Sequence, residues 1–66
     1  MRTYKDKLLE ILDQLEGFNV SDEIKYKKLR ALNDRNSDTI NKASPEIKLA
    51  LTYRFGDLLA KYYGQS

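Results

Sequence analysis

Apolar residues recur along the chain with steps of three and four, the spacing that places side chains on one face of an α-helix. No segment alternates between apolar and polar residues with a period of two, so no β-strand is expected. Three amphipathic stretches are separated by residues that typically begin or end helices. The pattern predicts an all-α fold in which residues 1–66 form a single domain, a small three-helix bundle.

The first helix is expected to begin after Thr3, whose side chain can cap it, with Asp6 placed to complete a capping box. Gly17 is a natural stop because glycine readily takes the left-handed conformation that follows a last helical turn. Phe18 and Val20 are expected to fold back onto the core. The apolar face of this helix consists of Tyr4, Leu8, Leu9, Ile11, Leu12 and Leu15.

The second helix is predicted to begin after Ser21, and it carries a weaker apolar face formed by Ile24, Leu29 and Leu32. The polar run 33–38 is either a turn or the exposed middle of a helix that continues to Ala43. If it is a turn, Ser37 or Asp38 caps a further short helix. The second helix is therefore either continuous or broken near Ser37.

The third helix has the clearest start in the chain. Ser44 can cap it, Pro45 suits the first helical position, and Glu46 lies where the helix dipole favours an anion. The helix is predicted to reach about Tyr63, with Gly64 closing it. One side of it can face the core, and its residues are Ile47, Leu51, Phe55, Leu58, Leu59 and Tyr62.

A second apolar line on the third helix has steps of four, three, four and three, the spacing of helix–helix contacts. Its residues are Leu49, Tyr53, Gly56, Ala60 and Tyr63. Gly56 and Ala60 are small enough for another helix to approach closely, and tyrosines combine an apolar body with a polar tip, as interfaces require. The line is either ordinary core or an intermolecular surface. We favour the surface, because two shorter helices struggle to cover both sides of a long one.

Polar residues give weaker signals. Asp57 and Lys61 have the spacing of an ion pair one helical turn apart. The acidic residues Asp6, Glu10 and Asp13 lie on one side of the first helix, where a solvated face is favoured over a cation site or an acid–base pair.

Composition argues against catalysis. The 66 residues include neither cysteine nor histidine, which removes disulfides, thiolate nucleophiles and the commonest metal ligand and general base. The three glycines are isolated, so no phosphate-binding loop is expected. The sequence predicts no enzyme, cofactor, metal or small-molecule substrate. Without a leader-like start or a membrane-length apolar run, a cytoplasmic location is expected.

The charge balance leaves a nucleic-acid interpretation as the alternative. Twelve lysines and arginines against ten acidic residues give a net charge of only +2. Cations in the second helix could contact phosphates, and Tyr26, expected to point away from the core, could stack on a base. The residues of this alternative are Lys25, Tyr26, Lys27, Lys28, Arg30 and Arg35.

The sequence thus predicts a non-catalytic regulatory or interaction protein that binds a protein partner, or a second copy of itself, through the third helix. So short a chain buries little surface and gains from a partner. Its size is similar to that of small helical regulators and inhibitors of bacteria and phages, a likeness of size alone. The alternative is a nucleic-acid-binding or nucleoid-associated regulator.

Overall fold

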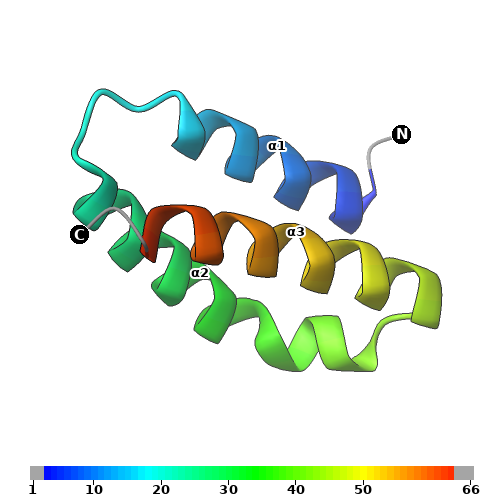
Figure 1. The fold of residues 1–66 in the computed structure, drawn as a ribbon. Helices are drawn as coiled ribbons and strands as arrows, with labels where there is room; N and C mark the ends of the chain where they lie inside the picture. The colour runs from blue at the N-terminus through cyan, green and yellow to red at the C-terminus, as the bar shows by residue number, and fades with distance from the viewer. Residues whose placement is uncertain (1–2, 64–66) are drawn as a thin grey trace.

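The computed structural model describes residues 3–63 and confirms the all-α class for that part of the chain, which contains no strand. It forms three helices, α1 (Tyr4–Glu16), α2 (Asp22–Lys42) and α3 (Pro45–Tyr63). Consecutive helices run in opposite directions, so that α1 and α3 point the same way (Figure 1). The bundle measures 33 × 22 × 17 Å along its principal axes.

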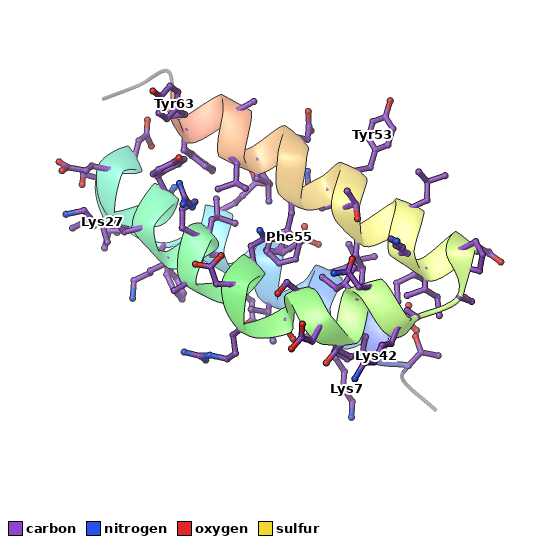
Figure 2. All side chains as sticks on the ribbon, turned by 90° about the horizontal axis from the view of Figure 1, so that it is seen from below. Lys7, Lys27, Lys42, Tyr53, Phe55 and Tyr63 are labelled. Atoms are coloured by element: carbon purple, nitrogen blue, oxygen red, sulfur yellow. The ribbon has the colours of Figure 1, made fainter. Side chains whose placement is uncertain are left out.

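The core lies between the three helices, and α2 and α3 are packed most closely. Figure 2 shows Phe55 pointing from α3 into the space beside α2. The predicted core face of α3 is confirmed, since four of its six residues are buried and Ile47 and Leu59 pack against them. The buried residues are Leu8, Leu12, Leu15, Leu29, Ile40, Leu51, Phe55, Leu58 and Tyr62.

The predicted helix starts are confirmed by their hydrogen bonds. Thr3 Oγ1 accepts from the Asp6 amide at 3.2 Å, and Asp6 Oδ2 accepts from the Thr3 amide at 3.4 Å, which completes the capping box. Ser21 Oγ accepts from the Ile24 amide at 3.4 Å. α3 begins at Pro45, as the sequence indicates.

The α2 helix is continuous, which decides the question that the polar run left open, and no break occurs near Ser37. Polar side chains in this run bond within the helix or to α1: Asn36 Nδ2 donates to the Leu32 carbonyl at 2.9 Å, and Tyr4 Oη donates to Asn36 Oδ1 at 2.7 Å. Ile40 is buried and anchors the last turns. Tertiary contacts on one side therefore hold a segment whose own apolar content is low.

α1 ends at Glu16 with Gly17 as its C-cap, which confirms the predicted stop, but two details of the α1–α2 connection were wrong. Gly17 is right-handed rather than left-handed, with φ −84° and ψ −3°, and its amide bonds back to the carbonyls of Asp13 and Gln14. Phe18 and Val20 are exposed rather than folded onto the core. The backbone of the connection swings out beyond the helix ends (Figure 1). The predicted stop at Gly64 lies outside the described residues.

Candidate protein-binding surface

The second apolar line of α3 lies on the solvent side of the bundle, and we call it the outer face of α3. All five of its residues are exposed: Leu49, Tyr53, Gly56, Ala60 and Tyr63. The exposed fractions of the three large side chains are 65%, 75% and 67% for Leu49, Tyr53 and Tyr63. Tyr53 points away from the other helices in Figure 2. α1 and α2 leave this face largely uncovered, although Tyr63 at its C-terminal end contacts Tyr26 of α2, and none of its five residues belongs to the buried core.

Gly56 opens a hollow in the middle of the outer face of α3. A Cβ atom built at this position would meet nothing within 4 Å, so the chain's own packing does not require a glycine here. The hollow continues into a groove of about 300 Å³ between α2 and α3, with Leu59 and Phe55 on one side and Asn33 and Asn41 on the other. A partner chain bound in this groove would contact apolar side chains on one side and side-chain amide groups on the other.

The C-terminal end of the outer face connects to α2 through two tyrosines. The ring centroids of Tyr63 and Tyr26 lie 5.5 Å apart with the planes tilted by 52°. Arg30 Nη1 donates to Tyr26 Oη at 3.1 Å, and this hydrogen bond is the main cause that raises the pKa of Arg30. The prediction that Tyr26 points away from the core was wrong, because this side chain is half-buried and packs against it. One of its faces is therefore already occupied.

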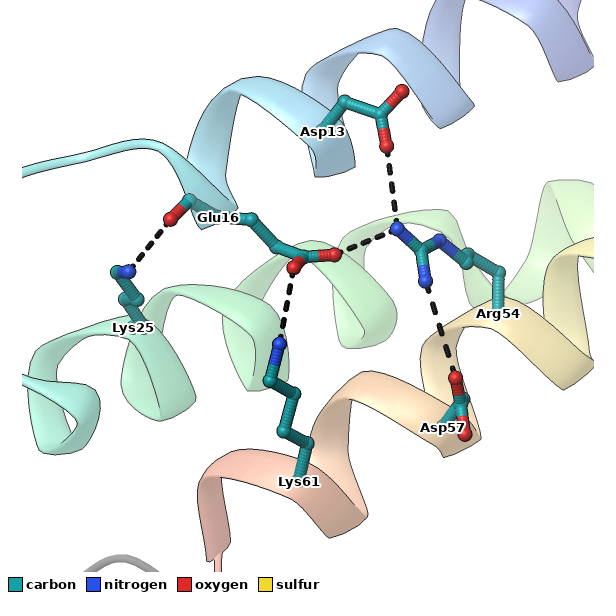
Figure 3. Close-up of polar contacts among 6 residues, drawn as sticks. All are labelled: Asp13, Glu16, Lys25, Arg54, Asp57 and Lys61. Atoms are coloured by element: carbon teal, nitrogen blue, oxygen red, sulfur yellow. Dashed lines mark hydrogen bonds and ion pairs between the residues drawn. The ribbon is translucent and has the colours of Figure 1, made fainter.

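A charged cluster holds α1 against the opposite flank of α3 (Figure 3). Arg54 Nη2 donates to Glu16 Oε1 at 2.6 Å and to Asp13 Oδ1 at 3.2 Å, and Lys61 Nζ donates to Glu16 Oε2 at 3.3 Å. The hydrogen bond from Lys61 to Glu16, followed by their Coulomb attraction, raises the pKa of Lys61. Arg54 also lies 3.9 Å from Asp57. We call these five residues the Glu16 cluster.

The Glu16 cluster corrects a prediction and was missed by sequence reasoning. The spacing of Asp57 and Lys61 indicated a pair within α3, but Lys61 reaches across to α1 and Asp57 pairs with Arg54. The sequence around Glu16 at the end of α1 does not indicate that its side chain will bind Arg54, which lies 38 residues away in the chain. The cluster sets a polar border along one side of the outer face of α3.

The six residues of the nucleic-acid alternative do not form one cationic face. Lys25 Nζ donates to the Glu16 carbonyl at 2.6 Å, and Lys27 pairs with Glu23 at 3.7 Å. Lys28 and Arg35 line a groove beside α1, whereas Arg30 is turned toward Tyr26. Nucleic-acid binding stays a prediction, with its cations pointing in several directions.

The acidic side of α1 is used within the fold. Asp6 caps α1 and Asp13 binds Arg54. Between residues 3 and 63 no cluster of three or more potential metal ligands occurs. In the same part of the chain, no helix combines the length and hydropathy that a membrane span needs.

No protein-family model, no curated protein and no solved structure matches this chain.

Proposed function

We propose that this chain is a non-catalytic interaction protein that holds a protein partner, either a foreign chain or a second copy, against the outer face of α3. In this proposal it acts in the cytoplasm as a small regulator or inhibitor of that partner. The observation that carries the proposal is the exposure of Leu49, Tyr53 and Tyr63, each about two-thirds or more open to solvent on a helix whose opposite face is buried.

The layout of the surface supports this role. An interface typically combines a central apolar patch with a polar rim, and aromatic residues are enriched at its centre. Here the large side chains Leu49, Tyr53 and Tyr63 enclose the small residues Gly56 and Ala60. Helix axes approach to about 8–10 Å when the side chains between them are small. A partner helix could therefore sit over Gly56 with the tyrosines on either side.

The Glu16 cluster supplies the polar border on one side. Arg54 and Lys61 are bound to Glu16, so their charges are fixed at the edge and do not cross the apolar patch. On the other side, the groove beside Gly56 carries the polar groups of Asn41 and Thr52. Both borders can hydrogen-bond to a partner or to water, as rims of interfaces do.

The first test measures molar mass by sedimentation across about three decades of protein concentration, from micromolar to millimolar, where weak association becomes visible. If the partner is a second copy, mass rises with concentration, and Gly56→Leu abolishes the rise. A Cβ atom at position 56 would meet nothing within 4 Å beyond the local helix, and the position is exposed, so we expect a leucine side chain to extend into solvent. The helical circular dichroism spectrum of this variant should therefore be unchanged.

For a foreign partner, a photoreactive amino acid replaces Tyr53 in the full chain and crosslinking is carried out in the source cells. The matched control places the same group at Thr39, which is exposed on α2. An adduct formed from position 53, absent from position 39 and lost in Gly56→Leu supports the proposal. A monomer at all concentrations without such an adduct would overturn it.

The nucleic-acid alternative has a separate test. Lys28 and Arg35, like the exposed Lys42, form no ion pair among residues 3–63, so these cations of α2 are available to a phosphate. If α2 binds a random duplex, affinity falls steeply with salt, and reversing Lys27 and Lys28 to glutamate removes it. The absence of a gel shift at low salt would end this alternative.

A further inference from the structure

We propose that the groove between α1 and α2 binds a short amphipathic helix of another protein that carries acidic side chains along one flank. This α1–α2 groove is lined mainly by Ile11, Leu15, Phe18, Lys28, Leu32 and Arg35. Its residues come from α1, the following connection and α2, so it is separate from the outer face of α3. The inference does not depend on the function proposed above.

The dimensions of the α1–α2 groove suit two turns of a helix. On the α2 wall, Lys28, Leu32 and Arg35 follow one another at steps of four and three, which corresponds to a rise of about 10 Å, or two turns. Ile11 and Leu15 face this wall from α1, and Phe18 extends their side of the groove from the connection after Glu16. The groove is open to solvent and encloses about 340 Å³. Helix-in-groove recognition uses apolar anchors at three- and four-residue spacing, which is the spacing of these walls.

The wall contributed by α1 and its connection is apolar and unsheltered. Ile11 and Phe18 have exposed fractions of 43% and 48%. Phe18 was expected in the core, and the fold places it at the end of this groove instead. Gln14, the remaining residue of this wall, is uncharged. Covering Ile11 and Phe18 would remove apolar surface from water, which favours an apolar strip on the occupant.

The wall contributed by α2 determines the charge of the occupant. Lys28 and Arg35 form no ion pair within residues 3–63, whereas Lys27, Arg54 and Lys61 are each paired. They lie two helical turns apart on the same side of the groove. Two carboxylates seven residues apart on an incoming helix would match them, while its apolar strip covers Leu32 and Phe18. A duplex would satisfy the cations but not the apolar wall.

The test uses the full chain and two synthetic helical peptides of about four turns, a length at which helices begin to form in water. Both carry leucines at three- and four-residue spacing. One has two glutamates seven residues apart, and the other has lysines in their place. We expect saturable binding of the glutamate peptide by calorimetry, with amide shifts at Ile11, Phe18 and Leu32 in NMR spectra.

Charge reversal identifies the α2 wall. The double variant Lys28→Glu/Arg35→Glu should weaken the glutamate peptide about tenfold or more and bind the lysine peptide instead. The matched control Lys42→Glu/Lys48→Glu changes two exposed lysines outside the groove and should leave binding unchanged. Phe18→Ala, at an exposed position, should weaken both peptides without loss of helical signal.

Three results would overturn the inference. One is the absence of saturable binding at millimolar peptide. Another is equal affinity for the two peptides. The last is duplex DNA binding that is lost in Lys28→Glu/Arg35→Glu without any peptide binding, which would assign these cations to nucleic acid. Gly56→Leu should keep full peptide affinity, so failure of this inference and failure of the α3 proposal remain distinguishable.

Discussion

The two faces of α3 both carry apolar residues at steps of three and four, but one is buried and the other is exposed. The inner face places Leu51, Phe55 and Leu58 in the core, with exposed fractions of 2% or less. The outer face presents Leu49 and Tyr53 to solvent. Each face has the apolar spacing that is typical of a buried helix face, so apolar periodicity alone does not say which face a protein buries. The difference comes from what the other two helices can reach.

The largest expected effect separates the two faces by stability. Phe55→Ala should lower the free energy of unfolding by about 3–5 kcal/mol, because it removes a fully buried aromatic side chain and leaves a cavity. Tyr53→Ala should change it by no more than about 0.5 kcal/mol, because the ring is already in water. Urea denaturation followed by circular dichroism measures both. Equal losses would mean that the outer face is core after all.

The next effect concerns the contact between α1 and α3. Glu16→Gln keeps the shape of the side chain but removes the charge that binds Arg54 and Lys61. We expect the free energy of unfolding to fall by about 1 kcal/mol, since the pairs are only partly shielded from water. The same denaturation experiment measures this, and the loss should shrink at high salt.

Glu23→Gln is the matched control, because within residues 3–63 Glu23 pairs only with Lys27, at 3.7 Å, and both side chains are about 70% exposed. Its effect should be no more than a few tenths of a kcal/mol. If the two variants were equivalent, the Glu16 cluster would be an ordinary surface pairing with no special part in docking α1.

The sequence predicted the fold class, the starts of the helices and the core face of α3, because these depend on local signals. Capping by Thr3 and Ser21 requires only residues three positions away. The continuity of α2 could not be predicted in the same way. It depends on Ile40 being buried and on Tyr4 reaching Asn36, which are contacts between distant parts of the chain.

The candidate surfaces were only partly predictable. The outer face of α3 was found from spacing, and its exposure required the structure because it depends on where α1 and α2 lie. The prediction that Phe18 lies in the core was wrong, because a large apolar residue in a loop is expected to be buried and the sequence does not show where its side chain points. The α1–α2 groove and the Glu16 cluster had no sequence signal, since each joins residues from different helices.

Gly56→Ala tests whether the outer face of α3 is open within the single molecule. Glycine inside a helix is less favourable than alanine by about 0.8–1 kcal/mol. Because no atom lies within 4 Å of the added Cβ, the variant should gain most of that amount, raising the melting temperature by roughly 4–8 °C. Thermal unfolding at low concentration measures this. A loss of stability would show that a neighbouring helix needs the space.

The smallest effect is a dependence of stability on alkaline pH, which comes from Lys61 at the contact of α3 with α1 and from Tyr4 at the contact of α1 with α2. The hydrogen bond with Glu16 raises the pKa of Lys61, and burial raises the pKa of Tyr4. The folded chain therefore holds both protons more tightly than the unfolded chain. This stabilisation is complete below the ordinary pKa values and disappears as pH rises through the raised ones, above about pH 10.

Denaturation between about pH 8 and pH 11 measures the alkaline loss. Glu16→Gln should reduce the alkaline loss of stability by removing the contribution of Lys61. Tyr4→Phe should reduce it by removing the contribution of Tyr4. Leu49→Ala, on the outer face of α3, removes no titrating group and should leave the slope unchanged. If Glu16→Gln kept the full alkaline loss, the bond between Lys61 and Glu16 would contribute nothing to the folded state, and Arg54 would be the partner of Glu16 that stabilises the contact between α1 and α3.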